Sequence, residues 1–317
     1  MAIKWLTAAI ASRIHQFSDY DATYPSYNPS GMSSRSLYYD KTCFILYFMN
    51  LELQGRTVLV AASSEGLGFA TAHAVLQENA NTWIGSRDSE KVQEALTALR
   101  NNPPNKQSRT GQIDGSNLDV TRADSIEAWV AAARSRYGEA IDGLVVNSGG
   151  PPPGLFSDFD DQAWQKAFEL LVLSAVRLVR ACLPGLAVRG GAILVVSSTS
   201  VTEPIEGLIL SNTLRSAAVA MAKTLSRELA PQGIRINCLA PGRFATGRVE
   251  RIDAAAAERL HCTPEEARHT VEATIPLGRY GQTEEFGRTA CWLLSPAASY
   301  ITGQLVTIDG GMTRGTW

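Results

Sequence analysis

The sequence has few of the residues that bind metal ions or form the disulfides that stabilise small folds. It contains 5 cysteines and 4 histidines in 317 residues, with no Cys-x-x-Cys pair. Only His261 and Cys262 are close in sequence. A scattered, odd set of cysteines is typical of reduced thiols inside a cell. We therefore expect a cytoplasmic protein with neither a disulfide framework nor a metal site.

The sequence also lacks a charge excess and long hydrophobic runs. The formal net charge is -2, from 29 basic and 31 acidic side chains. No basic stretch indicates a nucleic-acid surface, and no apolar run reaches the length of a membrane span. We expect a small-molecule substrate as the partner, with no nucleic acid and no stable membrane insertion.

Residues 1–50 differ in composition from the rest of the chain. Apolar residues spaced for one helical face are Ile3, Leu6, Ile10, Ile14 and Phe17. This pattern is typical of an amphipathic helix or a weak transit peptide, which would direct the protein to mitochondria. A segment rich in Tyr, Ser, Pro and Asn follows, and such composition favours disorder. We expect 1–50 to be a disordered or loosely docked extension, or Met49 to be the true start.

From Leu51 onward, strand and helix patterns alternate regularly. The expected strands are 57–61, 82–85, 117–120, 143–146, 192–196, 234–238 and 305–308, and helical patterns lie between them. Strands alternating with helices indicate a parallel sheet covered on both faces. We predict one α/β domain over 51–317, a doubly wound seven-stranded parallel sheet.

The first strand leads into a glycine-bearing turn and a helix. Gly66 and Gly68 follow the strand, and apolar residues at helical spacing come after them. Free N–H groups at such a helix start can bind a pyrophosphate, and glycine lets the backbone approach it closely. A Gly-x-Gly alone is weak evidence, because two glycines also serve helix packing.

Further motifs in order make the chain similar to the short-chain dehydrogenase/reductases, single-domain Rossmann oxidoreductases. These motifs are residues 62–68, Asp119-Val120, 147–150, Ser197-Ser198, 237–242 and 309–311. Residues 151–154 and 278–281 resemble the 3-oxoacyl-carrier-protein-reductase-like branch. The resemblance implies an NADP site formed by Ala62, Ser63, Ser64, Gly66, Leu67, Gly68, Ser86, Arg87, Asp119, Val120, Asn147, Ser148, Gly149, Arg215, Pro241 and Gly242.

The segment after the second strand indicates NADP rather than NAD. NAD enzymes of this fold place an acid there to hold the ribose 2′-hydroxyl. Here the segment reads Gly85-Ser86-Arg87, and Arg87 can bind a 2′-phosphate. Glu65 is a weak argument for NAD, because relatives often carry a base at that position.

The catalytic Asn–Ser–Tyr–Lys tetrad of the family is mostly missing. Aligned on the flanking motifs, its positions fall on Leu171, Ser198, Ser211 and Arg215. Only Ser198 keeps the family residue, and Arg215 keeps a positive charge. Ser211 cannot replace tyrosine as a proton donor, and losing a positioned acid costs on the order of 10²- to 10⁴-fold in rate.

Other polar residues could compensate for the lost tyrosine. Asn212 can bond the substrate or cap its helix, and Arg177 lies on the helix of Leu171. Glu203 and Glu206 lie in the loop before Ser211, where solvated acids are the alternative. We name Ser198, Ser211, Arg215 and Asn212 as catalytic candidates.

These residues lead to an NADPH-dependent oxidoreductase that reduces a C=O or C=N bond of a small organic molecule. The substrate is expected under residues 243–274. The alternatives are a tailoring enzyme that cyclises or rearranges its substrate, and a cofactor-binding protein without redox turnover. Apolar residues on several faces of the helices at 161–183 and 210–230 predict a homodimer or homotetramer.

Overall fold

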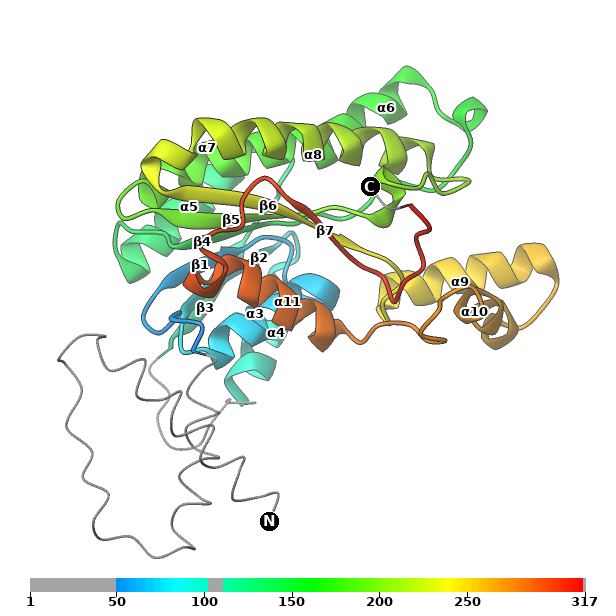
Figure 1. The fold of residues 1–317 in the computed structure, drawn as a ribbon, viewed down its shortest axis with the longest axis horizontal. Coiled ribbons are helices and arrows are strands. Elements are labelled where there is room, and N and C mark those ends of the chain that lie inside the picture. The colour runs from blue at the N-terminus through cyan, green and yellow to red at the C-terminus, as the bar shows by residue number, and fades with distance from the viewer. Residues whose placement is uncertain (1–49, 102–110, 316–317) are drawn as a thin grey trace, which may run out of the picture. The chain divides into compact units, whose positions relative to one another are not determined.

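The computed structural model describes residues 50–101 and 111–315, so the expectations for 1–48 lie outside it. Seven parallel strands form one sheet in the order β3-β2-β1-β4-β5-β6-β7. Their bounds are β1 Thr57–Val60, β2 Asn81–Ser86, β3 Ile113–Asn117, β4 Gly143–Val146, β5 Gly191–Val196, β6 Ile234–Pro241 and β7 Leu305–Ile308. This arrangement, visible in Figure 1, is the predicted doubly wound sheet.

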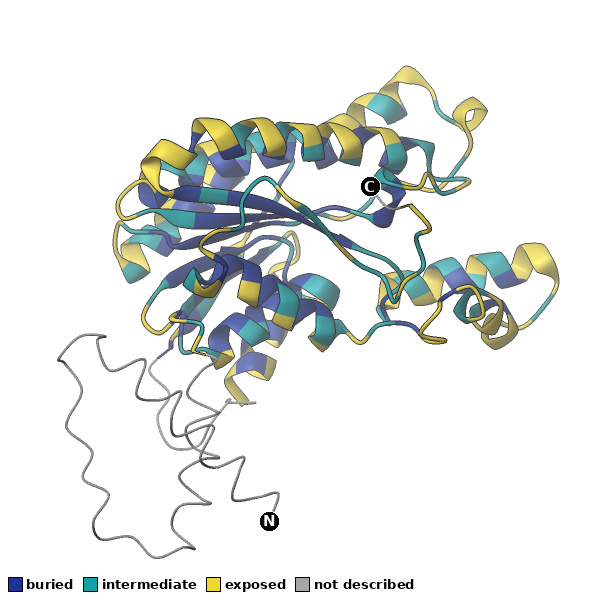
Figure 2. Ribbon diagram, in the orientation of Figure 1, coloured by how far each residue is buried: buried dark blue, intermediate teal, exposed yellow. Residues whose placement is uncertain are grey.

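Helices cover both faces of this sheet (Figure 1). On one face lie α3 (Gly66–Gln77), α4 (Ser89–Asn101) and α11 (Thr283–Leu294), and on the other α5 (Ala123–Tyr137), α7 (Ser174–Leu186) and α8 (Ile209–Glu228). Alternate residues of a strand point to opposite faces: Val58 packs in the first layer and Leu59 in the second. The central strands β1 and β4 are buried on both faces, and the middle of the sheet is dark blue in Figure 2, whereas β3 and β7 at the edges are more exposed.

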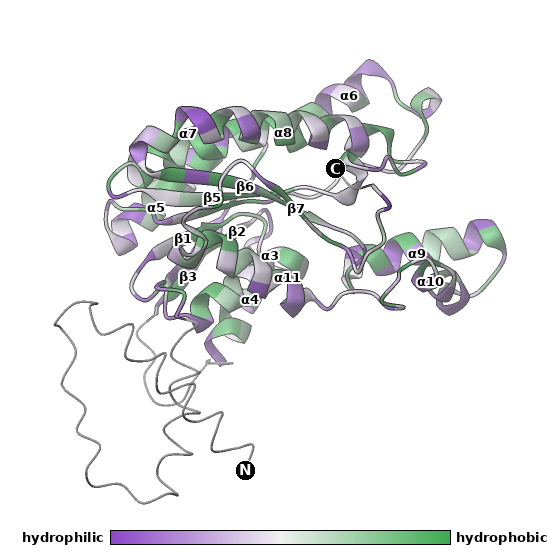
Figure 3. Cartoon of the chain, viewed as in Figure 1, coloured by the Kyte–Doolittle hydropathy of each residue, from purple (hydrophilic) through white to green (hydrophobic). Residues whose placement is uncertain are grey.

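Hydrophilic residues colour the outer sides of helices such as α7 and much of the loops (Figure 3). On α4 the buried residues are Val92, Ala95, Leu96 and Leu99, a spacing of three to four residues. Such spacing places them on one stripe that faces the sheet. Burial of this stripe holds α4 in place and positions the loops at the carboxyl edge of the strands.

Two expected elements differ in the structure. The third strand is Ile113–Asn117, earlier than 117–120, and carries Asp, Gly, Ser and Asn rather than an apolar run. The long helix at 161–183 is divided into α6 (Asp161–Phe168), a π-helix at Glu169–Leu173, and α7. Within 243–274 the chain forms α9 (Gly247–Leu260) and α10 (Pro264–Glu272).

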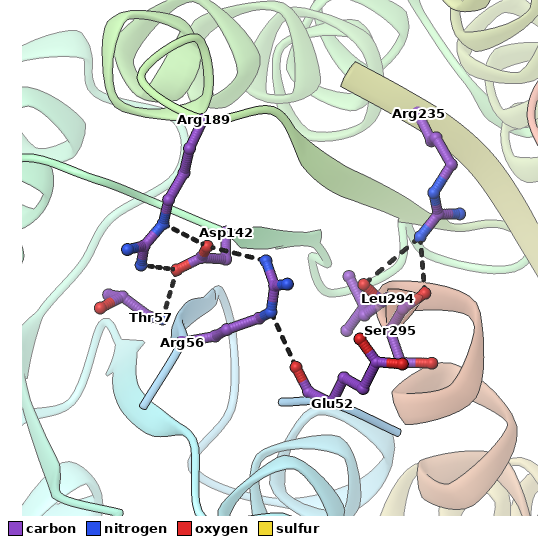
Figure 4. A network of polar contacts seen from close by, with 8 residues as sticks. All are labelled: Glu52, Arg56, Thr57, Asp142, Arg189, Arg235, Leu294 and Ser295. Carbon is purple, nitrogen blue, oxygen red and sulfur yellow. Dashed lines mark hydrogen bonds and ion pairs between the residues drawn. The ribbon is translucent and has the colours of Figure 1, made fainter. Parts of the chain in front are cut away.

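Two polar clusters hold the edge of the sheet where the strands begin. Asp142, whose side chain is 1% exposed, accepts bonds from the Thr57 N–H at 2.7 Å, from Arg189 and from Arg56 (Figure 4). Arg235 donates to carbonyls at the end of α11, including Leu294 and Ser295. A cation at a helix C-terminus satisfies carbonyls that have no partner in the helix. We assign both clusters to stability.

Among the helices of 50–101 and 111–315, none is long and apolar enough to cross a membrane.

Candidate active site

The turn between β1 and α3 leaves N–H groups available to an anion. Helix α3 begins at Gly66, and the side chain of its N-cap residue Glu65 makes no capping hydrogen bond. The first N–H groups of a helix have no partner within it, and they lie at its positive end. A Cβ on Gly68 would overlap the carbonyl oxygen of Ala62. The turn therefore requires glycine at 68, and its backbone N–H groups could serve as a pyrophosphate cradle.

Ala62 takes a strained conformation in this turn. Its φ is 47°, in the left-handed region that glycine adopts readily and other L-residues avoid. The family has glycine at this position. The carbonyl of Ala62 accepts a 3.0 Å hydrogen bond from Asn147 Nδ2. Asn147, one of the expected cofactor residues, thus joins the end of β4 to the turn.

Ser63 has a structural task in this turn. Its side chain is fully buried, and its hydroxyl donates to Val60 O at 2.7 Å and accepts from Gly85 N at 3.1 Å. Its own N–H donates to Gly85 O. The hydroxyl and the N–H are both used between β1 and β2. These groups of Ser63 position the turn, and its expected contact with a cofactor stays a prediction.

Near the end of β2 lie a cation, Arg87, and an acid, Glu65, that has a base close to it. The side chain of Arg87 is exposed and makes no hydrogen bond or ion pair among the described residues. Glu65 lies 3.5 Å from Lys91 Nζ, so its charge has a nearby counterion. The charges of Arg87, Glu65 and Lys91 sum to +1. Glu65, the residue that argued against NADP, therefore has a base beside it that offsets its charge.

Asp119 is anchored within its own loop. Its carboxylate accepts from the Thr121 N–H at 2.9 Å and from the Thr121 hydroxyl at 2.7 Å. Partial burial acts to raise the pKa of Asp119, but these hydrogen bonds and nearby Arg87 and Arg122 outweigh it and lower the pKa. The carboxylate therefore stays charged at neutral pH and keeps the loop after β3 in shape.

Ser211 and Arg215 are brought together one turn apart on α8. Arg215 Nε donates to Ser211 Oγ at 3.2 Å. Its other nitrogens reach carbonyls at the ends of two strands, with Nη1 at 3.1 Å from Val196 O and 3.4 Å from Ser197 O. Nη2 lies 3.5 Å from Gly149 O. Of the five N–H groups of a guanidinium, four are thus engaged, and one on Nη2 remains.

Leu171 occupies the position of the family asparagine and provides no polar relay there. It is 5% exposed, lies in the π-helix, and packs with Leu210 and Leu214 of α8. A π-helical turn within an α-helix often marks a functional site. Here the turn is present, but its inward residue is apolar and cannot hold a water or pass a proton.

Ser198 remains at the carboxyl end of β5. Its Oγ accepts from Ser200 N at 3.1 Å and caps a short 3-10 helix, Thr199–Val201. The hydroxyl hydrogen is still able to donate to a substrate oxygen or nitrogen. Capping and catalysis are compatible for this serine.

A small polar cavity lies behind Arg215. It holds about 10 Å³, close to the space that one water needs. Ser148 and Ser197 line it, and Ser197 Oγ has no hydrogen-bond partner among the described residues. The cavity is too small for an organic substrate.

Three of the other polar candidates make hydrogen bonds within the protein, although Asn212 Oδ1 has no partner among the described residues. Asn212 Nδ2 donates to Ile205 O at 2.9 Å, so the amide holds the preceding loop and does not cap α8. Arg177 donates to Thr121 O, away from Ser211, and does not compensate for the tyrosine. Glu203 accepts from Arg314 N at 3.0 Å and holds the C-terminal segment. Glu206 is exposed.

Two residues that could contribute to the site were not predicted from the sequence. Thr246 caps α9, and its methyl carbon would lie 3.7 Å from a Cβ on Gly66, opposite the pyrophosphate cradle. Arg248 lies against Gly150, where its guanidinium occupies the space of a Cβ. Burial and the charge of Arg248 lower the pKa of Arg215 to about 10. The Pro-Gly motif just upstream of Thr246 was a usable signal, whereas Arg248 gave none.

A larger cavity of about 300 Å³ lies between α9 and α10, within the region expected to cover the substrate. Thr246, Val249, Asp253, Arg268 and Tyr280 are among its lining residues. None of its lining residues is Ser198, Ser211 or Arg215. The cavity is therefore separate from the catalytic candidates named above. Within 50–101 and 111–315, no group of three His, Cys, Asp or Glu side chains could hold a metal ion.

The turn after β1, the carboxyl ends of β4 and β5 and the α8 residues define a dinucleotide-binding oxidoreductase of the Rossmann class. A family model described as Enoyl-(Acyl carrier protein) reductase matches residues 61–313. The human dehydrogenase/reductase SDR family member 4 is 31% identical over 261 residues, 82% of this chain and 88% of that protein. The chain therefore belongs to the short-chain dehydrogenase/reductase family.

Other relatives agree with this assignment. The 3-oxoacyl-[acyl-carrier-protein] reductase FabG of Thermotoga maritima is 29% identical, over 83% of this chain and 99% of that protein. An L-sorbose reductase of Gluconobacter frateurii, solved with NADPH and L-sorbose, superposes with a TM-score of 0.78 at 28% identity, covering 84% of this chain and 100% of that chain. An NADPH-bound short chain oxidoreductase of Pseudomonas aeruginosa PAO1 with an atypical catalytic center has a TM-score of 0.73 at 28% identity, covering 82% and 98%.

Proposed function

We propose that the protein is an NADPH-dependent reductase of a C=O or C=N bond in a small organic molecule, with an atypical active site. The observation that carries this proposal is the combination of a glycine turn with uncapped N–H groups at the start of α3 and the Ser211–Arg215 pair in place of tyrosine and lysine. The exposed Arg87 supports NADPH over NADH. Similarity to FabG and to the NADPH-bound reductases supports a carbonyl-reductase-like branch.

The fixed groups of the protein orient the two reactants. Bound NADPH supplies the hydride. Gly68 and the start of α3 place the pyrophosphate, and Arg215, held by strand-end carbonyls, supports the nicotinamide side. Ser198 is free to donate its hydroxyl hydrogen to the acceptor atom. These roles need placement and electrostatics rather than a titrating side chain.

The missing phenol favours an acceptor that does not need a protein acid. A ketone oxygen must be protonated as hydride arrives, and Leu171 and Ser211 cannot do this. An iminium carbon is already electrophilic. We therefore propose that C=N bonds, or substrates with an acid of their own, are reduced better than simple ketones.

A paired assay tests the function. Oxidation of NADPH is followed with a cyclic imine, 2-methyl-1-pyrroline, and with a β-keto thioester, acetoacetyl-N-acetylcysteamine. Imine turnover above thioester turnover supports the proposal. Efficient thioester reduction without imine turnover would contradict the proposal and indicate an ordinary carbonyl reductase. NADPH binding without oxidation by either substrate would instead support the non-redox alternative, and a rearranged product without net oxidation would support the tailoring alternative.

We also propose that the catalytic domain is separable from 1–50 and self-associates. Leu51–Trp317 forms a compact unit by itself, which supports separability. A chain starting at Met49 should keep its melting temperature and NADPH affinity. The outer side of α8 carries the small exposed residues Ala217 and Ala220, which let a second helix approach closely. Light scattering at micromolar concentration should give a dimer or tetramer, and a monomer would contradict this.

A further inference from the structure

Two arginines from different helices meet at the end of β4. Arg215 of α8 places Nη2 3.5 Å from the carbonyl oxygen of Gly149. Arg248 of α9 places its guanidinium where a side chain on Gly150 would begin. The two cations therefore lie at consecutive residues of one strand-end loop. Any side chain at position 150 would displace Arg248, so this glycine makes the arrangement possible.

Neither cation has an ion-pair partner in the part of the chain that the structure describes, although Glu250 lies in the first turn of α9. Among the described residues, Arg248 also has no hydrogen bond from its side chain. Asp253, the buried acid of α9, is bonded to the Tyr280 hydroxyl and lies 3.9 Å from Arg243. Arg248 is exposed and Arg215 is half-buried, but like charges that lie close together still repel each other.

The pKa values show the same imbalance. Burial lowers the pKa of Arg248, and the charge of Arg251 lowers it further. The pKa of Arg215 is lowered by burial and by Arg248. A nearby acid would favour the protonated form of an arginine and would raise its pKa instead. An anion from outside the protein would remove this repulsion.

The position of Arg248 on its helix is also unfavourable without a ligand. It is the second residue of α9, and Arg251 lies one turn further along. The N-terminal end of a helix carries a partial positive charge that repels cations and attracts anions. Helix start and arginine fork thus add their positive potentials at one place, and the acid of the first turn, Glu250, forms no ion pair among the described residues.

The anion that fits this place is that of a substrate rather than the cofactor pyrophosphate. The pyrophosphate has its own cradle at Gly66, opposite Thr246. Arg215 and Arg248 lie instead at Gly149 and Gly150, on the side where Ser211 marks the reaction centre. Arg215 has one N–H left to offer, and Arg248 has its whole fork.

We propose that Arg248, assisted by Arg215, binds a carboxylate of the substrate next to the carbon that accepts hydride. The inference deepens the proposed function and rests on it: the preferred substrates are oxo acids or imine carboxylates rather than their neutral analogues. A planar carboxylate matches the fork of an arginine with two parallel hydrogen bonds.

The first arm of the test compares matched acid and neutral substrates. The pairs are 1-pyrroline-2-carboxylate with 2-methyl-1-pyrroline, and acetoacetate with methyl acetoacetate. Wild-type kcat/KM should favour the charged member by at least about tenfold, since a bond between charged groups is worth that much or more. Arg248→Gln should remove the preference by raising KM for the acids alone. Equal kcat/KM for acid and neutral members in the wild type would overturn the proposal.

The variants need a matched control and a cofactor readout. Arg259→Gln removes an equal charge from the exposed end of the same helix and should leave the acid preference unchanged. Arg248→Lys should restore part of the preference, because it returns the charge without the fork. NADPH Kd should change by less than about twofold in Arg248→Gln, because the pyrophosphate has its own cradle. A much weaker NADPH Kd, with acid and neutral substrates affected alike, would assign Arg248 to the cofactor and refute the inference.

A second arm does not depend on turnover. Malonate, which is not reduced, is titrated calorimetrically into the NADPH-bound protein. Wild type and Arg259→Gln should bind it, and Arg248→Gln should bind it at least about tenfold more weakly. If NADPH is never oxidised but malonate binding still requires Arg248, the reductase proposal fails and the anion site stands. Equal malonate binding by wild type and Arg248→Gln would refute the anion site.

Discussion

Arg215 Nε lies 3.2 Å from Ser211 Oγ, so the residues at the lysine and tyrosine positions of the family are bonded to each other. In this pair the serine oxygen accepts from a cation that is itself fixed to strand-end carbonyls. The arrangement is a rigid positioning device. It keeps a positive charge beside the cofactor site but offers no phenol.

The first prediction follows from this pair. Ser211→Ala should reduce kcat for an imine by less than about tenfold, because the serine supports Arg215 and gives no proton to the substrate. Loss of a true general acid costs on the order of 10²- to 10⁴-fold. Single-turnover rates with saturating NADPH measure the effect. A loss of about 10³-fold would make Ser211 the acid and refute the interpretation.

The pH dependence should also lack a neutral ionisation from this pair. The pKa of Arg215 is lowered by burial and by Arg248 to about 10, so its guanidinium stays protonated below that pH. The Kd of malonate, whose carboxylates stay ionised throughout this range, should therefore be flat from about pH 7 to 9 and rise as Arg215 loses its proton above about pH 10, by up to about tenfold per pH unit. A change in the malonate Kd near pH 7 would point to a different group.

The sequence predicted the sheet well because buried parallel strands and amphipathic helices carry local signals. The third strand was misplaced because Ile113–Asn117 has polar residues typical of a turn. The π-helix at Glu169–Leu173 could not be foreseen, since this apolar run favours an ordinary helix and only packing against α8 distinguishes the two.

The same contrast applies to the site. Gly66, Gly68 and Arg87 were recognisable from their order along the chain. The task of Ser63 depends on Gly85, 22 residues away, and that of Arg248 on Gly150. Such roles arise from long-range contacts that have no local pattern.

Arg87 should determine the choice of cofactor. Replacing it with serine removes a guanidinium that makes no hydrogen bond or ion pair among the described residues. NADPH Kd should weaken by about 10- to 100-fold, as expected for loss of a hydrogen bond between charged groups. The NADH Kd serves as the internal control and should stay within about threefold, because NADH has no 2′-phosphate. Unchanged NADPH affinity, or wild-type binding of NADH as tight as that of NADPH, would contradict the assignment.

Asp142 should be required for stability rather than function. Asp142→Asn removes a buried charge shared by Arg56, Arg189 and the Thr57 N–H. We expect a loss of about 3 kcal/mol in the free energy of unfolding, seen as a melting temperature lower by about 6 to 12 °C. NADPH Kd should not change, because the cluster lies where the strands begin. Asp114→Asn is the control: its exposed ion pairs should contribute less than about 1 kcal/mol.

The last prediction concerns the strained turn at Ala62. Ala62 has a φ of 47°, which costs an L-residue about 1 kcal/mol or more. Ala62→Gly removes this strain but gives the unfolded chain more freedom, worth about 0.5 to 1 kcal/mol. The two effects nearly cancel, so the variant should be as stable as the wild type or slightly more stable. Ala62→Val adds bulk at the same φ and should destabilise by more than about 1 kcal/mol. Urea unfolding of both variants measures these differences. A glycine variant less stable than the valine variant would mean that the left-handed conformation is not what limits this position.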